Sequence, residues 1–178
     1  LGTSAAVYEA NGDYAFGLFA SGWCRFLDHA SRSLCEDRDN AVALVGGKWL
    51  CHESCWTGCA KIAIETGQIV DIACQGGLRL YCAPIRAGDE IVGAINFGYG
   101  SPPQDPVVLA QIAGRYNVPV ERLRQLAADY ETRPDFIIEV AKNRLQTVAK
   151  LLGEIIRRCR LEKALRAERD RAQQYLDI

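Results

Sequence analysis

Four of the eight cysteines in this sequence are spaced in a way that suits one soft metal centre. Cys51 and Cys55 are four residues apart, so a helix would present both sulfurs on one face. Cys24 lies in another predicted helix, and Cys74 ends a predicted strand just before Gly76-Gly77, where the backbone can turn tightly. Thiols from these places could converge on one zinc ion or one iron–sulfur cluster. We therefore predict the ligands Cys24, Cys51, Cys55 and Cys74, with Cys35 as the next candidate.

The cysteines also allow other interpretations. No Cys-x-x-Cys pair occurs, so the spacing is not that of a zinc ribbon, and the same thiols could be reactive or line a ligand cavity. Cys82, inside a predicted strand, and Cys159, on a predicted helical seam, fit small buried hydrophobic side chains. Cys59 fits the core and the site about equally. Because the sequence shows no export signal, we expect a reducing, cytoplasmic location, which makes a disulfide framework the weaker interpretation.

Aromatic residues concentrate in the cysteine-bearing segments, which favours a second kind of site. This would be a metal-free cavity for a small organic molecule, of the partly apolar type that binds such ligands. Four residues are expected to line it: Trp23, Trp56, Tyr81 and Asn96.

A cysteine-dependent enzyme is a third interpretation, and the sequence supports it least. It needs a histidine beside a thiolate. Only His29 and His52 are present, and His52 follows Cys51 directly, so a helix would turn the two side chains to different sides. The sequence also lacks the Gly-x-Ser-x-Gly, P-loop and Gly-x-Gly-x-x-Gly motifs. We therefore predict no catalytic residue and no enzymatic activity.

The elements that would position these residues form a mixed head. Three short β-branched runs predict a three-stranded meander: residues 68–74, 78–85 and 90–97. Residues 5–9 and 14–18, with Asn11-Gly12 as the turn between them, predict a further hairpin. Five further segments predict helices: residues 22–35, 40–46, 52–66, 106–116 and 120–130. A hairpin, then several helices, then a meander is the order of elements in a PAS- or GAF-like α+β fold, in which helices flank an antiparallel sheet.

The chain changes character after Pro134. From Lys142 to Ile178 it carries ten Lys or Arg against five Asp or Glu. Apolar residues there follow the 3-4 spacing of a coiled coil at Leu145, Val148, Leu152, Ile155 and Cys159. The seam then shifts to Leu161, Leu165, Ala172 and Leu176, which indicates a phase break. A helix over 134–176 would be roughly 60 Å long, so its far half must project or pair. We predict a cysteine-rich domain over 1–132 and a helical, homodimeric stalk over 133–178.

Three segments of the meander carry a family resemblance. Ile72-Ala-Cys74-Gln-Gly-Gly-Leu78, Tyr81-Cys-Ala-Pro-Ile85 and Glu90-Ile-Val-Gly-Ala-Ile-Asn-Phe-Gly98 resemble the PocR-type sensory domain of bacterial signalling proteins. The resemblance spans roughly residues 5–160, and the earlier cysteines of that family would fall on Cys24 and on the Cys51/Cys55 pair. It implies a PAS-like input domain that binds a small effector, or holds a cysteine-bound centre, upstream of a kinase, cyclase or DNA-binding output.

Composition narrows the function classes further. A net charge of −1 argues against a general nucleic-acid binder, and no uncharged apolar run approaches the ~18 residues of a membrane span. A chain that begins at Leu1 and contains no methionine predicts an input module excised from a longer protein. We therefore expect a sensory domain that detects a small effector or redox state at its cysteines and signals through its C-terminal helix.

Overall fold

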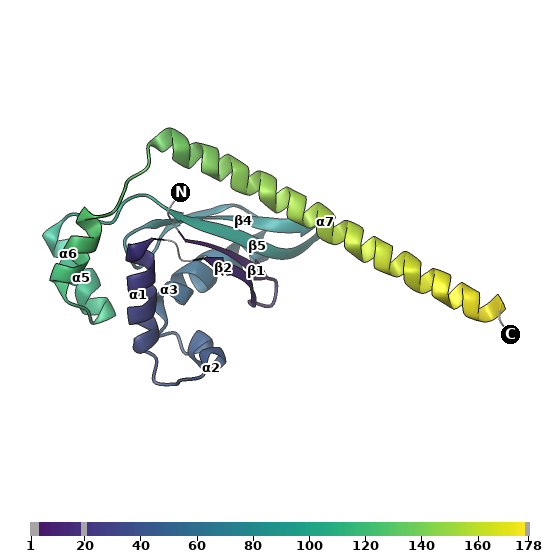
Figure 1. Cartoon of the computed structure of the whole chain (residues 1–178), viewed down its shortest axis with the longest axis horizontal. Coiled ribbons are helices and arrows are strands. Elements are labelled where there is room, and N and C mark those ends of the chain that lie inside the picture. Colours follow the sequence, from purple (N-terminus) through teal and green to yellow (C-terminus); the bar gives the residue numbers. More distant parts are fainter. Residues whose placement is uncertain (1–3, 19–20, 177–178) are drawn as a thin grey trace.

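A computed structural model describes residues 4–18 and 21–176, and the strands of these segments form one antiparallel sheet (Figure 1). The sheet has the order β2-β1-β5-β4-β3, so the β1–β2 hairpin joins the meander through the pairing of β1 with β5. The strands are β1 (Ala5–Glu9), β2 (Tyr14–Leu18), β3 (Val70–Ala73), β4 (Arg79–Ala87) and β5 (Glu90–Tyr99). Each overlaps a predicted run, which confirms the hairpin and the meander.

Helices flank this sheet, as the α+β prediction requires. They are α1 (Gly22–Ser33), α2 (Asn40–Val45), α3 (Leu50–His52), η1 (Glu53–Ala60), α4 (Lys61–Thr66), α5 (Pro106–Tyr116), α6 (Val120–Ala128) and α7 (Asp135–Leu176). The predicted helix 52–66 begins two residues earlier, at Leu50, and its first half, η1, is a π-helix, in which hydrogen bonds join residues five apart. The end of this segment at Gly67, in the left-handed conformation, is confirmed.

The strands β4 and β5 are buried on both faces, whereas β2 at the edge of the sheet is mostly exposed. Side chains alternate between the two faces along each strand. On β4, Leu80 and Cys82 face η1 and α4, whereas Tyr81, Ala83 and Ile85 face α7. A third apolar cluster lies beside the sheet, where α1 packs against α5 and α6. The cysteine-bearing helices and α7 therefore lie on opposite faces of one sheet, and β4 and β5 contact both (Figure 1).

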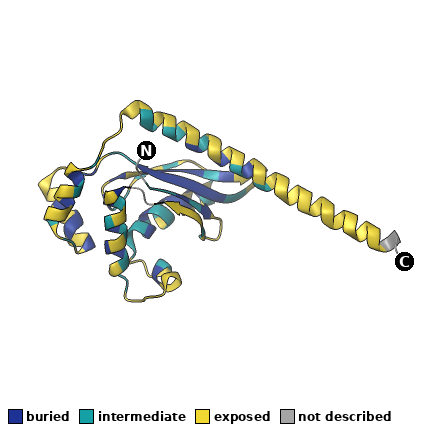
Figure 2. Cartoon of the chain, in the orientation of Figure 1, coloured by how far each residue is buried: buried dark blue, intermediate teal, exposed yellow. Residues whose placement is uncertain are grey.

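The first half of α7 packs on the sheet, and the second half projects beyond it (Figures 1 and 2). Of the predicted seam, Leu145 and Leu152 face the sheet, whereas Val148 and Ile155 are 41% and 57% exposed. Cys159 is also exposed within the single chain and is not a buried filler there. The predicted boundary near residue 133 thus marks where α7 begins, but α7 is part of the sheet's core as far as Ile156.

No helix in the described part of the chain has both the length and the apolar character needed to cross a membrane.

Candidate functional site

The four cysteines predicted as ligands line one small cavity between the sheet and the helices. Cys24 comes from α1, Cys51 from α3 and Cys55 from η1, while Cys74 follows β3 directly. The cavity holds about 40 Å³. It is completed by Ser4, Ser54, Leu78, Leu80, Gly98 and Tyr116. Thiols that are up to fifty residues apart in the sequence therefore share one site.

Local structure explains how the helices place their thiols. Ser21 caps α1, and its hydroxyl accepts a hydrogen bond from the Cys24 backbone N–H at 3.0 Å, which fixes Cys24 in the first turn. Cys51 lies in the last regular turn before η1, and Cys55 lies inside the π-helical segment. Asn96 of β5 donates its amide hydrogen to the Cys55 carbonyl at 3.0 Å. The irregular helix is thus tied to the sheet at the residue that carries a site thiol.

Hydrogen bonds from two sides hold the turn that carries Cys74. The Cys74 N–H donates to the Leu78 carbonyl at 2.7 Å, and Gly77 adopts φ +83°, which favours glycine. The Trp23 indole N–H donates to the Gly76 carbonyl at 2.9 Å. The Gln75 N–H donates to the hydroxyl of Ser54 at 3.1 Å. The turn is therefore fixed both to α1 and to η1, the two neighbouring sources of thiols.

The cavity is a low-dielectric environment for its thiols. Burial raises the pKa of Cys74 to about 11 and raises the pKa values of Cys51 and Cys55 well above their ordinary range. Among the described residues, the lining includes no Lys, Arg, Asp or Glu that could compensate a thiolate. These three thiols are therefore protonated at neutral pH unless a cation replaces their protons.

Tyr116 and Ser4 are polar residues of the cavity that the sequence did not point to. The Tyr116 hydroxyl lies 3.8 Å from Cys51 Sγ. The Ser4 hydroxyl is buried and has no hydrogen-bond partner among the described residues. Tyr116 ends an amphipathic helix and has the spacing of an ordinary core residue, so no sequence signal distinguishes it. Both hydroxyls could donate hydrogen bonds to thiolate sulfur.

The donor set suits a thiophilic metal centre. Cysteine sulfur is the ligand that zinc and iron–sulfur clusters share, and the lining is otherwise apolar. As the side chains lie, no group of three or more His, Cys, Asp or Glu residues in 4–18 and 21–176 is arranged to hold a metal ion. Residues Cys24, Cys51, Cys55 and Cys74 would hold such a centre, and their sulfurs would have to approach one another to do so.

The other cysteines lie elsewhere. Cys35 lines a different, open cavity near α2, and its thiol donates a long hydrogen bond to the Ser31 carbonyl at 3.7 Å. Cys59 and Cys82 are fully buried between η1 and the sheet. Cys82 is therefore the core residue that its position in a strand predicted, and Cys59, which the sequence left undecided, is also part of the core.

The four residues predicted to line an organic-ligand cavity are not brought together. Trp23 lies in the α1 core and supports the Cys74 turn, as described above. Trp56 packs against the ring of Tyr8, with the two ring centres 5.3 Å apart. Tyr81 lies on the opposite face of the sheet, where its hydroxyl accepts a hydrogen bond from Gln146 of α7 at 2.8 Å. Asn96 contacts the η1 backbone.

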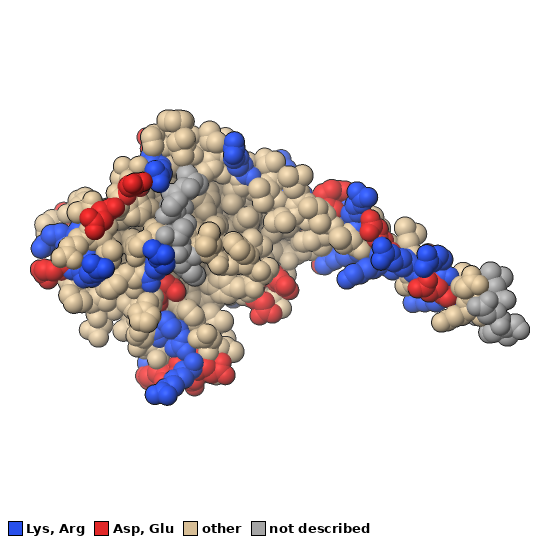
Figure 3. Space-filling model, in the orientation of Figure 1, with Lys and Arg blue, Asp and Glu red and all other residues tan. Residues whose placement is uncertain are grey.

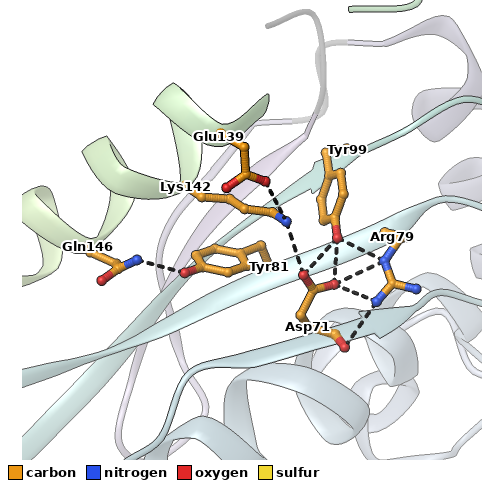
Figure 4. A network of polar contacts seen from close by, with 7 residues as sticks. All are labelled: Asp71, Arg79, Tyr81, Tyr99, Glu139, Lys142 and Gln146. Atoms are coloured by element: carbon orange, nitrogen blue, oxygen red, sulfur yellow. Dashed lines mark hydrogen bonds and ion pairs between the residues drawn. The ribbon is translucent and has the colours of Figure 1, made fainter. Parts of the chain in front are cut away.

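A polar network connects the strand next to the site with α7 (Figure 4). Asp71 of β3 accepts hydrogen bonds from the Tyr99 hydroxyl at 2.6 and 2.7 Å and pairs with Arg79 at 2.7 Å. Lys142 of α7 reaches the same carboxylate at 3.3 Å and also pairs with Glu139. Partial burial alone would raise the pKa of Asp71, but the hydrogen bonds from Tyr99, Arg79 and Lys142 outweigh it and lower this pKa.

Comparison of the chain with protein-family models gives no match, and comparisons with curated proteins and with solved structures give no significant one.

Proposed function

We propose that this chain is a non-enzymatic sensory input domain of a bacterial signal-transduction protein. It detects a small effector or a redox state at the four-cysteine cavity, with a zinc ion or an iron–sulfur cluster as the bound centre, and it signals through α7 to an output domain. The resemblance of the meander to the PocR-type domain supports this proposal, and so does the position of the cavity directly across the sheet from α7. We further propose that the domain works in the cytoplasm as a homodimer.

The convergence of Cys24, Cys51, Cys55 and Cys74 on one cavity is the observation that carries the proposal. Cavities for organic ligands commonly measure about 300–1,000 Å³, whereas one water molecule takes about 30 Å³ of the liquid. A cavity of about 40 Å³ therefore accommodates a single ion, while an organic effector would have to force the helices away from the sheet. An iron–sulfur cluster would require a smaller movement of the helices away from the sheet than an organic effector would. The cavity volume therefore favours the metal-based proposal over the metal-free one.

The sheet provides a route from the cavity to α7. Cys74 follows β3, and three residues earlier on the same strand Asp71 contacts Lys142 of α7. Cys55 is tied through its carbonyl to Asn96 of β5, and the next residue, Phe97, faces the α7 side of the sheet. Drawing the sulfurs onto a metal would displace β3 and η1, and both movements would change the surface on which α7 lies.

A cysteine-dependent enzyme finds less support at this site. A nucleophilic thiol needs a lowered pKa, whereas burial raises the pKa values of Cys51, Cys55 and Cys74. His52, the histidine next to Cys51 in the sequence, has its Nδ1 atom 3.0 Å from the Tyr14 hydroxyl, and this hydrogen bond joins it to Tyr14 rather than to a thiol.

Metal analysis and a UV–visible spectrum of anaerobically purified protein test the proposal directly. We expect bound zinc, or iron with sulfide and visible absorption, in the wild-type protein. Cys55→Ser and Cys74→Ser should lose this centre, because each removes one thiol from the cavity. The matched controls Cys35→Ser and Cys159→Ser should keep it, because these thiols lie elsewhere.

A colourless, metal-free wild-type protein that binds neither added zinc nor reconstituted iron and sulfide would contradict the metal centre. A thermal-shift screen with small organic molecules then tests the metal-free alternative. Binding that survives Cys55→Ser and Cys74→Ser would establish that alternative, whereas a screen without hits would leave no support for effector binding at this cavity.

A further inference from the structure

The two flanks of α7 differ in character where the helix crosses the sheet. The flank toward β3 is polar and exposes Glu139, Asn143, Lys150 and Glu154. The opposite flank exposes large apolar side chains instead. These are Val140, Val148, Leu151 and Ile155, which are between 41% and 57% exposed. Such an apolar stripe on an otherwise charged helix indicates a surface that another element covers.

The apolar flank borders a groove between α7 and the strands β1 and β5. The groove holds about 600 Å³ and is open along one side. Ala5 of β1 with Ile95 and Phe97 of β5 form its floor, and among the residues that the structure describes Arg144 is the only charged one in its lining. The remaining lining residues are Ile137, Val140, Ala141, Leu145 and Val148 of α7. In Figure 3 the sheet-spanning half of α7 carries few charged side chains, in contrast to the projecting half.

The spacing of residues along this flank fits a helix as the missing element. Ile137, Arg144 and Leu151 repeat every seven residues, and Ala141, Val148 and Ile155 form a second series offset by four. The first series continues through Arg158 to Leu165 and Ala172 in the projecting half, and the second continues through Glu162 and Arg169 to Leu176. Leu145 and Leu152, which pack on the sheet, do not belong to these series. Leu165 and Ala172 keep the register of Leu151, whereas Leu161 lies outside it.

We propose that α7 of a second copy of this chain lies in this groove, parallel to the first α7. The surface suits a second copy because its heptad repeat is complementary to itself: each helix offers the stripe that the other needs. The arrangement buries Val148, Leu151 and Ile155 of both chains, whereas the floor residues Ile95 and Phe97 are already buried within each chain. This inference rests on one part of the proposed function, the homodimer, and names the surface through which the two chains associate.

The projecting half of α7 decides the relative direction of the two helices. Residues 157–174 are exposed throughout (Figure 2). Most of the stability of a helix in a protein comes from packing of one of its faces, and no face of this half is buried within the part of the single chain that the structure describes. A parallel pair brings the two projecting halves together along the seam through Leu165 and Ala172, whereas an antiparallel pair would send them in opposite directions. The parallel arrangement also delivers both helices to the same end of the dimer.

Sedimentation equilibrium of the purified wild-type chain and of matched lysine variants tests the surface. Val148→Lys and Leu151→Lys place a charge in the seam, and we expect each to weaken dimerisation at least tenfold. Asn143→Lys adds the same charge on the polar flank and should leave the dimer unchanged. A chain that ends at Arg160 keeps the groove and should still dimerise. Thermal unfolding of each variant shows that it is folded.

Cysteine cross-linking tests the direction. In a Cys159→Ser background, Leu151→Cys should form an intermolecular disulfide with a diazene-dicarboxamide oxidant, which takes up the two electrons and two protons that the thiols lose. Asn143→Cys should not cross-link in the same background. A monomeric wild-type chain at about 100 µM, seam variants that dimerise normally, or a dimer without the Leu151→Cys cross-link would overturn the proposal. Metal content of the folded Val148→Lys variant is measured separately, so failure of the dimer is distinguishable from failure of the metal site.

Discussion

At the scale of single residues, the surroundings of each side chain determine its chemistry. Cys51, Cys55 and Cys74 are chemically identical to Cys159, yet burial raises their pKa values, while Cys159 is exposed on the projecting helix. The same effect acts in the opposite sense on His52, because burial disfavours the charged form of any titratable group. Neutral thiols in an apolar cavity are stable until a cation replaces their protons.

His52 gives a pH-dependent prediction. The ring is 4% exposed, and burial lowers the pKa of His52 below its value of about 6.5 in an unfolded chain. Below about pH 6.5 the unfolded chain therefore binds more protons than the folded one, and the free energy of unfolding falls as the pH is lowered toward the folded-state pKa. We expect urea titrations between pH 7.5 and 5 to show this loss, at most about 1.4 kcal/mol per pH unit for one proton.

His52→Gln is the matched control for this prediction, since glutamine cannot titrate and can still share a hydrogen bond with Tyr14. The difference in unfolding free energy between the wild type and this variant should shrink as the pH falls. A difference that stays constant from pH 7.5 to 5 would contradict a lowered pKa of His52.

At the scale of elements, the position of α7 depends on one glycine and one polar network. A Cβ atom at Gly153 would lie 1.8 Å from the Arg86 carbonyl oxygen, so α7 crosses β4 as closely as a backbone can. Lys142 holds the other end of the crossing, with its ammonium group over the rings of Tyr99 and Tyr81, at 4.5 and 5.3 Å from their centres. Between these two points Leu145 and Ala149 pack on the sheet.

Gly153→Ala should destabilise the protein, although alanine favours helices over glycine by about 1 kcal/mol. The added methyl group must push α7 away from β4, and overpacking of this kind costs about 1–3 kcal/mol. Gly114→Ala in α5 is the control, because a Cβ there meets open space, and it should be neutral or stabilising. Urea unfolding of both variants measures the effect. An equal gain in stability at both sites would show that α7 does not approach β4 this closely.

Lys142→Met should loosen the start of α7 by removing the ion pair to Asp71 and the cation–π contacts. Because the pair is partly exposed, we expect a loss of roughly 1 kcal/mol. Hydrogen exchange of the backbone amides of residues 135–145 should become faster, while amides in β4 should not change. Lys150→Met, on the exposed polar flank of the same helix, should alter neither quantity. Unchanged exchange in Lys142→Met would mean that apolar packing alone holds this end of α7.

At the scale of the whole molecule, three apolar clusters hold one continuous body. The sheet joins the cluster under η1 and α4 to the cluster under α7, and the turn after Cys74 joins the first of these to the α1–α5–α6 cluster. The candidate cavity lies where these units meet. A change in the shape of the cavity would therefore be felt both by the α1–α5–α6 cluster and by the sheet on which α7 packs.

Thiol labelling measures whether this body opens as a unit. Cys159 should react with an exposed-thiol reagent within the mixing time of a manual assay, and Cys159→Ser should remove this fast phase. Cys59 and Cys82 have no exposed surface, so they should react only when the sheet separates from η1. Their labelling rate should then rise with urea in parallel with global unfolding. Labelling of Cys59 as fast as that of Cys159 in native buffer would contradict a closed core.

The sequence alone predicted the five strands that the structure describes, the main helices and the Cys51/Cys55 pair, because each rests on a local pattern. That Cys24 and Cys74 join this pair was a hypothesis that only the tertiary structure could test. Hairpin turns, β-branched runs and the spacing of Cys51 and Cys55 depend on neighbouring residues only. The same reasoning could not separate Leu145 and Leu152 from Val148 and Ile155, since all four fit one helical seam. Leu145 and Leu152 pack on β4 and β5, and only the tertiary structure shows which side of α7 faces the sheet.

What the sequence determined by itself is therefore the order of the elements, their approximate ends and the positions of the candidate thiols along the chain. The tertiary structure alone decided that Tyr81 lies on the face opposite the cysteines, that Tyr116 and Ser4 border the cavity, and that η1 is a π-helix at Cys55. The physical reason is common to these features. Each depends on which surfaces meet when the sheet, α1 and α7 pack, and such contacts join residues far apart in the chain.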